Sequence, residues 1–127
     1  MAKAVPHITD AELEILKRLW AEPGSTIREL TISLYGEPTN SHIGTVQKLI
    51  QRLETKKLVK RDRRHFAHTF AAKVSQAEVA GMQLDELARK VTGGSLLPFI
   101  SHLVEAWRLS DQEKAEIQKL LNGGTGG

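Results

Sequence analysis

Residues 42–72 read HIGTVQKLIQRLETKKLVKRDRRHFAHTFAA and specify a long amphipathic helix followed by a β-hairpin. The apolar residues Ile43, Val46, Ile50 and Leu53 are separated by three, four and three positions, which is the period of an α-helix. We therefore predict a helix over residues 42–56 that buries this stripe and leaves a polar face toward the solvent.

The second part of this segment has the pattern of two short strands. Leu58 to Arg61 is typical of a strand, and the polar run over residues 62–65 is typical of a turn. Phe66 and Phe70, with Ala67 and Thr69 between them, favour a second strand. We predict a β-hairpin over residues 58–72.

On both sides of this segment the pattern Ser/Thr-x-x-Glu recurs, four times in all, beginning at Thr9, Thr26, Ser75 and Ser110. In this capping box the hydroxyl accepts a hydrogen bond from an early helix amide, and the Glu carboxylate accepts one from the cap amide. These starts, together with the breaks at residues 22–25, 36–40 and 93–94, predict further helices over residues 10–21, 27–35, 76–91, 95–107 and 111–121.

The order of these elements predicts a mainly α fold. Three helices followed by a two-stranded hairpin form an N-terminal winged helix-turn-helix, which we place at residues 7–74. A C-terminal three-helix dimerisation arm follows at residues 75–121, and the glycine-rich residues 122–127 are expected to be a disordered tail.

Composition limits the functions that are open to this chain. Its 127 residues contain no cysteine, which excludes disulfides, thiolate catalysis and cysteine metal sites and fits a reducing cytoplasm. No apolar run approaches the roughly 20 residues of a membrane helix, and the first ten residues do not form a signal peptide. We expect a cytoplasmic protein without a membrane span.

The charge is distributed unevenly. Residues 1–74 carry 13 Lys/Arg and 8 Asp/Glu, whereas residues 75–127 carry 5 and 7. Residues 48–73 alone hold nine basic and two acidic side chains. A basic half that is joined to a mildly acidic half indicates that the first half meets a polyanion.

The polar face of the helix over residues 42–56 contains no acid and suits the DNA major groove. Lys48 can bind guanine or phosphate, Gln51 can read adenine, and Thr45 can contact a thymine methyl group. Arginines in the following hairpin suit phosphates or the minor groove. The candidate DNA-binding residues are Thr26, His42, Gly44, Thr45, Lys48, Gln51, Arg52, Arg61, Arg63, Arg64, His65 and His68.

No constellation of side chains points to an enzyme. We find no nucleophile beside a base, no phosphate-binding loop and no paired acids in an apolar setting. His65 and His68 would point to opposite faces of a strand, and no acid or cysteine completes a metal site near them. We expect no metal and no cofactor.

The helix over residues 95–107 is apolar around too much of its circumference to be covered from one side. Packing on its own winged helix is one way to cover it, but a second copy of the chain is the cover that we favour. The candidate dimer-interface residues are Leu84, Leu87, Val91, Leu96, Leu97, Phe99, Ile100, Leu103, Val104, Trp107, Ile117, Leu120 and Leu121.

Over residues 7–121 the sequence resembles the penicillinase-repressor family of transcriptional regulators. The motifs that carry the resemblance are Ile8-Thr-Asp-Ala-Glu12 with Leu16 and Leu19-Trp20, Thr26-Ile-Arg-Glu-Leu30, Thr45-Val46, Leu49-Ile-Gln-Arg52-Leu53, Lys56-Lys57-Leu58-Val59, Gly93-Gly-Ser95, Leu103-Val-Glu105 and Leu109-Ser110 with Glu113. The resemblance implies a homodimeric repressor that binds a palindromic DNA operator near its own gene. It also implies that Thr45, Lys48 and Arg52 contact DNA.

Four departures from the family's pattern bear on DNA binding and on induction. Gly44 stands where the family often has a Lys, and Ala72 stands where it tends to have a Pro. The pair His102-Leu103 replaces the Asn-Phe bond that a sensor protease cuts in inducible members, and the cysteine motif of copper-responsive members is missing. The release signal is therefore open between proteolysis by a sensor, a ligand and a protein partner.

One alternative function stays open at this point. A winged helix with a basic face can also bind an acidic protein instead of DNA. Failure to bind DNA at any salt concentration would favour this protein-interaction module.

Overall fold

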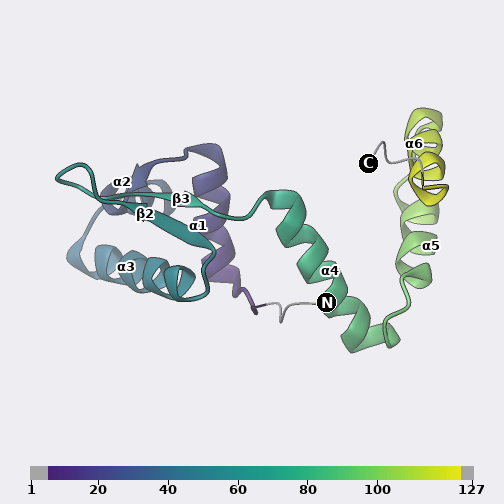
Figure 1. Cartoon of the computed structure of the whole chain (residues 1–127), viewed down its shortest axis with the longest axis horizontal. Helices are drawn as coiled ribbons and strands as arrows, with labels where there is room; N and C mark the ends of the chain where they lie inside the picture. Colours follow the sequence, from purple (N-terminus) through teal and green to yellow (C-terminus); the bar gives the residue numbers. More distant parts are fainter. Residues whose placement is uncertain (1–5, 124–127) are drawn as a thin grey trace. The chain divides into compact units, whose positions relative to one another are not determined.

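The computed structural model describes residues 6–123 and contains six α-helices and three strands in that range. Figure 1 labels the helices and the strands β2 and β3, and its colours follow the chain from the N-terminus to the C-terminus. The elements are α1 (Asp10–Ala21), β1 (Ser25–Thr26), α2 (Ile27–Tyr35), α3 (Asn40–Thr55), β2 (Val59–Asp62), β3 (Thr69–Ala72), α4 (Gln76–Thr92), α5 (Leu97–Ala106) and α6 (Asp111–Leu121). This arrangement confirms the predicted mainly α winged-helix fold with C-terminal helices.

All four predicted capping boxes form. At α1 the Thr9 hydroxyl accepts from the Glu12 amide at 3.2 Å, and the Glu12 carboxylate accepts from the Thr9 amide at 2.9 Å. Equivalent reciprocal pairs begin α2, α4 and α6 at Thr26, Ser75 and Ser110. These local bonds explain why the predicted starts of these helices agree with the structure.

The start predicted for α3 is wrong by two residues. The helix begins at Asn40 instead of His42, because the Thr39 hydroxyl accepts from the His42 amide at 3.1 Å and caps the helix earlier. At the other end, the Leu58 amide donates to the Leu53 carbonyl, and Lys57 adopts a positive φ of 64°. This left-handed turn leads the chain from α3 directly into β2.

The predicted second strand of the hairpin is too long at its start. Phe66 and Ala67 lie in the loop, because Asp62 pairs with Thr69 as the last register of β2 and β3. The turn begins at Asp62, whose carboxylate accepts hydrogen bonds from the Arg64 amide and guanidinium. A third strand also joins the sheet: Ser25 and Thr26 of β1 pair with Phe70 and Thr69, which gives the order β1-β3-β2.

A single core holds the winged helix together. It consists of apolar side chains from α1, α2, α3 and the sheet, with Ile15, Leu16, Leu19, Leu30, Val46, Ile50, Leu53 and Phe70 at its centre. Trp20 packs against it and donates its indole N–H to the Val74 carbonyl at 2.8 Å, which fixes the chain after β3 onto α1. Since α3 buries Val46, Leu49, Ile50 and Leu53, its opposite side is held toward the solvent.

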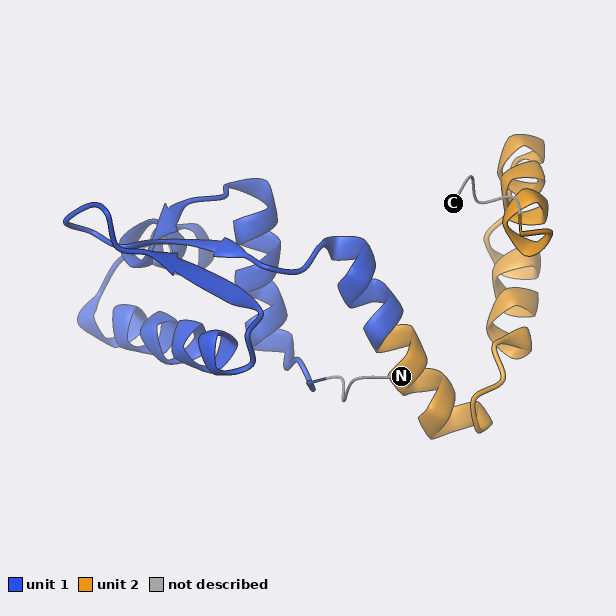
Figure 2. Cartoon of the chain, in the orientation of Figure 1, with its two compact units in different colours: residues 1–82 blue, residues 83–127 orange. Residues whose placement is uncertain are grey.

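The chain divides into two compact units, residues 1–82 and 83–127 (Figure 2). The division falls inside α4, whose first half contributes Val79 and Met82 to the core of the first unit. The boundary at residues 74 and 75 stays a prediction. Of the expected tail over residues 122–127, residues 124–127 lie outside the described part of the chain.

The second unit is helical and has little core of its own. Neither α5 nor α6 contains a buried residue, and Ala88 of α4 is the buried apolar residue of this unit among residues 83–123. None of the helices in the described part of the chain is both long and apolar enough to cross a membrane.

Candidate nucleic-acid interface

The solvent face of α3 presents the predicted DNA-reading side chains together. Thr45, Lys48, Gln51 and Arg52 are all exposed on it, and Gly44 is partly exposed in the same helix. Lys48 and Arg52 take part in none of the ion pairs formed within residues 6–123. Their positive charges therefore face the solvent without a carboxylate partner, as a site for phosphates or base edges requires.

A hollow lies between this helix face and the sheet, and Gly44 forms part of its wall. Lys48 and Gln51 line it from α3, and Arg61 lines it from β2. A Cβ atom added at Gly44 would meet no protein atom within 4 Å. Packing inside the protein therefore does not require glycine here, and the absence of a side chain leaves the helix backbone open to close approach from outside.

Arg61 connects the wing to α3 instead of extending into the solvent. Its Nε donates to Glu54 Oε2 at 3.0 Å and its Nη2 to Glu54 Oε1 at 2.8 Å. Its Nη1 lies 3.2 Å from His68 Nδ1, and the guanidinium lies 4.8 Å from the Phe70 ring centroid. The hydrogen bonds from Arg61 hold the pKa of Glu54 below its ordinary value, and Glu54 in turn raises the pKa of Arg61.

This contact changes what can be expected of the predicted residues Arg61 and His68. All three guanidinium nitrogens of Arg61 already have partners inside the protein, so its first role is to fix the angle of the hairpin relative to α3. His68 is part-buried against it. Sequence reasoning missed Glu54 in this role, because the residue lies seven positions from Arg61 and in a different element.

The loop between β2 and β3 carries the remaining predicted basic residues. Arg63, Arg64 and His65 are exposed there, and the loop projects from the body of the first unit (Figure 1). Arg64 forms an ion pair with Asp62 at 2.6 Å, and its hydrogen bonds hold the pKa of Asp62 far below its ordinary value. The Arg64 side chain is still 82% exposed, so the pair leaves it accessible to a phosphate.

The first turn of α2 lies beside this loop. The Thr26 hydroxyl accepts the hydrogen bond of the capping box from the Glu29 amide. Arg28 is exposed and lines one hollow with Phe66 and His68. Sequence reasoning did not single out Arg28, although a basic residue just after a capping Thr was a usable signal. His42 stacks on Tyr35 with ring centroids 4.3 Å apart, and its Nδ1 lies 3.1 Å from the Glu37 carbonyl oxygen.

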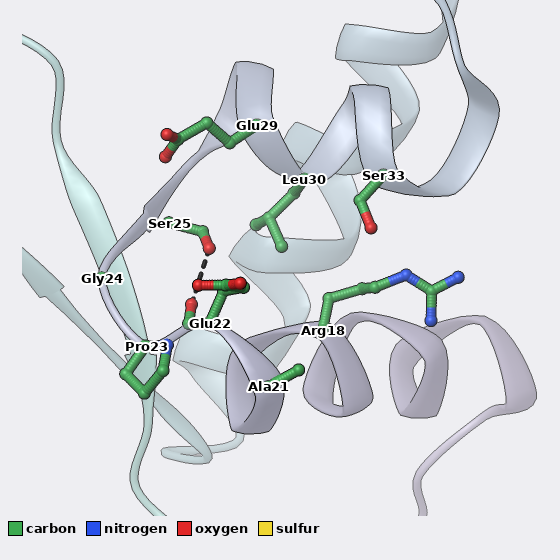
Figure 3. A pocket seen from close by; sticks show the side chains of 9 residues that line it. All are labelled: Arg18, Ala21, Glu22, Pro23, Gly24, Ser25, Glu29, Leu30 and Ser33. Carbon is green, nitrogen blue, oxygen red and sulfur yellow. Dashed lines mark hydrogen bonds between the residues drawn. The ribbon is translucent and has the colours of Figure 1, made fainter.

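A separate hollow between α1, the turn over residues 22–25 and α2 does not suit DNA. Figure 3 shows Arg18, Glu22, Glu29 and Ser33 around it. The Ser25 hydroxyl donates to the Glu22 carbonyl at 2.6 Å, and the Glu29 carboxylate accepts from the Thr26 amide. Two acids in its wall make it a poor surface for a polyanion.

Comparison with known proteins identifies the family. The model of the penicillinase repressor family matches residues 8–123, which is most of the chain. The chain belongs to the penicillinase repressor family. It is also 23% identical, over 119 residues, to the penicillinase repressor of Bacillus licheniformis, covering 94% of this chain and 92% of that protein. Penicillinase repressors are DNA-binding regulators of transcription and not a class of enzymes, which agrees with the helix-turn-helix described above.

In this penicillinase-repressor chain, the predicted interface residues of the second unit are largely accessible. Ten of the thirteen are between 41% and 68% exposed, whereas Phe99, Ile100 and Ile117 are partly buried; the exposed residues are Leu84, Leu87, Val91, Leu96, Leu97, Leu103, Val104, Trp107, Leu120 and Leu121. On an ordinary protein surface, exposed apolar residues are scattered singly, whereas here many large ones are exposed within one short segment.

Proposed function

We propose that this protein is a homodimeric repressor that binds a palindromic DNA operator near its own gene and leaves it in response to an inducing signal. The observation that carries the proposal is the acid-free exposed face of α3, with Thr45, Lys48, Gln51 and Arg52. Lys48 and Gln51 are suited to base edges in the major groove, and Arg52 and Thr45 to bases or phosphates.

The fixed angle of the wing supports this function. Because Arg61 ties β2 to Glu54 near the end of α3, the basic loop and the helix face form one preorganised surface. Arg63, Arg64 and Arg28 extend the positive charge of that surface beyond the helix. Phosphate contacts of this kind supply affinity without reading sequence, whereas the α3 face supplies the reading.

The second unit supports the dimer. Helices α5 and α6 bury none of their residues within the described chain, although the sequence of α5 is predominantly apolar. A second copy of the same surface would remove these side chains from water, and the resulting two-fold symmetry matches a palindromic operator.

The experiment is a nuclease-protection footprint of full-length protein on DNA from upstream of its gene. We expect two protected half-sites related by a dyad and spaced by about one helical turn or a multiple of it. Lys48→Ala should abolish the footprint, whereas Lys17→Ala, which removes an exposed lysine of α1, should leave it unchanged. Protection that is equal on scrambled DNA, or that survives Lys48→Ala, would contradict sequence reading by the α3 face. The absence of protection on any DNA would favour an acidic protein as the partner of the basic face.

A further inference from the structure

Phe66 occupies an unusual place at the tip of the wing. Its relative exposure is 106%, which makes it the most exposed large apolar side chain of residues 6–123. Phe70, four residues further along, is only 1% exposed and belongs to the core. The two phenylalanines of the hairpin therefore have opposite roles, and only Phe70 stabilises the fold.

The shape of the loop does not depend on the Phe66 ring. The turn is held by the bonds from Arg64 to Asp62, and its ends are held by the pairing of Asp62 with Thr69. Phe66 is not packed against the core. An aromatic side chain that contributes nothing to packing and extends fully into water is a candidate for contact with a partner.

The surroundings of Phe66 indicate the chemistry of that partner. It directly follows three exposed residues of the loop, which are Arg63, Arg64 and His65. Phe66 also shares a hollow with Arg28 at the start of α2. A protruding apolar ring that is surrounded by cations suits a polyanion with stackable apolar surfaces inside it, which describes duplex DNA.

Minor-groove binding proteins use this combination of groups. They place arginines in the groove and insert apolar wedges, phenylalanine among them, between base steps, which partly unstacks the steps and bends the duplex. Because β2 is fixed to α3 through Arg61 and Glu54, a wing beside a helix in the major groove reaches the neighbouring minor groove in one defined register.

We infer that Phe66 inserts into the minor groove that flanks each operator half-site and wedges open one base step there. This inference rests on the proposed function and adds a specificity determinant to it. Pyrimidine–purine steps such as TA and CA/TG unstack most easily, so the operator should favour one of them at that position. The wing would then read the deformability of the DNA at a step where it makes no hydrogen bond to a base.

The test uses full-length protein and duplexes of the footprinted operator in which single adenines are replaced in turn by the fluorescent base 2-aminopurine. Unstacking raises the fluorescence of this base, so the wild-type protein should increase it at one flanking step per half-site. Phe66→Ala should remove the increase and weaken binding about ten-fold, which corresponds to the loss of one buried aromatic side chain.

Two matched variants separate the ring from the charge. Phe66→Leu keeps an apolar wedge and should keep most of the fluorescence increase, whereas Arg63→Ala should weaken binding without removing the increase. Both positions are exposed, so none of the three variants should shift the midpoint of urea unfolding appreciably.

The possible outcomes are distinct. If wild-type protein binds the operator specifically but Phe66→Ala gives the same affinity and the same fluorescence, the wedge is wrong and the repressor function stands. If Phe66→Ala changes the dimerisation constant and not the fluorescence, the ring serves a second protein copy, and the wedge is again wrong. If wild-type protein binds operator and scrambled DNA alike, the proposed function and the wedge fail together.

Discussion

Arg61 of β2 and Glu54 of α3 are joined by two hydrogen bonds of 3.0 and 2.8 Å, which connect the wing directly to α3. Each side chain is only about a quarter exposed, with 27% for Arg61 and 26% for Glu54. A bidentate arginine–carboxylate pair fixes the relative orientation of the two side chains as well as their distance. The position of the wing loop relative to the α3 face therefore depends on this pair.

Separating these two residues should loosen the wing. We expect Arg61→Ala and Glu54→Ala each to lower the unfolding free energy by about 1 kcal/mol, with a coupling of about 0.5–1 kcal/mol in a double-mutant cycle measured by urea denaturation. Arg61→Ala should also weaken operator binding by loosening the wing. Arg61→Lys should weaken it as well, because an ammonium group cannot form both hydrogen bonds to Glu54. Strictly additive losses would show that the two residues act independently.

The same pair predicts a dependence of stability on pH. Because Arg61 lowers the pKa of Glu54 in the folded protein below the ordinary value of 4.5, the stability it contributes is fully present above pH 4.5 and is lost as the pH falls through the lowered pKa. Glu54→Gln should flatten this acid-side loss in denaturation curves measured between pH 6 and 3. Identical slopes in the variant and the wild type would contradict the assignment. Glu12, Asp62 and Glu113 also have lowered pKa values, so only the difference between the two proteins isolates Glu54.

A substitution at Gly44 allows stability and DNA binding to be tested separately. Gly44→Ala should raise the unfolding free energy by about 0.5–1 kcal/mol, because alanine favours the helix and the added Cβ meets no atom within 4 Å. The same methyl group should weaken operator binding about ten-fold if the helix backbone lies against the groove. Gln47→Ala, at an exposed position of α3 that lines the same hollow as Gly44, provides a comparison that adds no side-chain bulk. Unchanged binding by the stabilised Gly44→Ala variant would show that the backbone at Gly44 stays clear of DNA.

Lys56, directly after α3, compensates the buried charge of Glu12 in α1. Its Nζ lies 2.6 Å from Glu12 Oε1, and Glu12 is completely buried with its second oxygen unpaired. Burial acts to raise the pKa of Glu12, but the bonds from Lys56 and Thr9 hold it below its ordinary value. Lys56→Ala should cost about 2–3 kcal/mol in thermal or urea unfolding. Lys57→Ala, which alters the neighbouring exposed lysine, is the control, and an equal loss in both variants would contradict a specific role for Lys56.

A charged substitution at Leu103 tests the predicted dimer interface. It is 43% exposed in α5, so Leu103→Asp should leave the single chain folded and shift the protein to monomers in light scattering, with much weaker operator binding. His102→Asp introduces the same charge at the next position, on the side of α5 away from most of its apolar residues, and should remain dimeric. A dimer that survives Leu103→Asp would place the interface elsewhere.

The sequence predicted those features that depend on neighbours in the chain. The capping boxes at Thr9, Thr26, Ser75 and Ser110 are local, and the helices α1 and α6 have the predicted bounds. The period of α3 also placed Thr45 and Lys48 on the solvent side. The extent of β3 was missed because the register is decided by Asp62, which pairs with Thr69 and binds Arg64.

Features that depend on distant contacts were beyond the sequence. The two residues of β1 are too few to produce a strand pattern, and they become a strand only because Phe70 and Thr69 lie beside them. Arg61 has the sequence appearance of a free basic residue in the hairpin, and only the fold brings Glu54 to it. The exposure of Phe66 follows from the register of the hairpin, which the alternating pattern alone placed differently.

Operator reading by α3 is tested most directly by a fluorescence-anisotropy titration of full-length protein with labelled upstream DNA and with a scrambled duplex, at two salt concentrations. If the α3 face reads an operator, the upstream DNA will bind at least about a thousand-fold more tightly than the scrambled DNA. Both affinities will fall steeply with salt, because lysines and arginines displace counterions from the phosphates. Equal, weak binding to both duplexes would contradict operator reading by the α3 face.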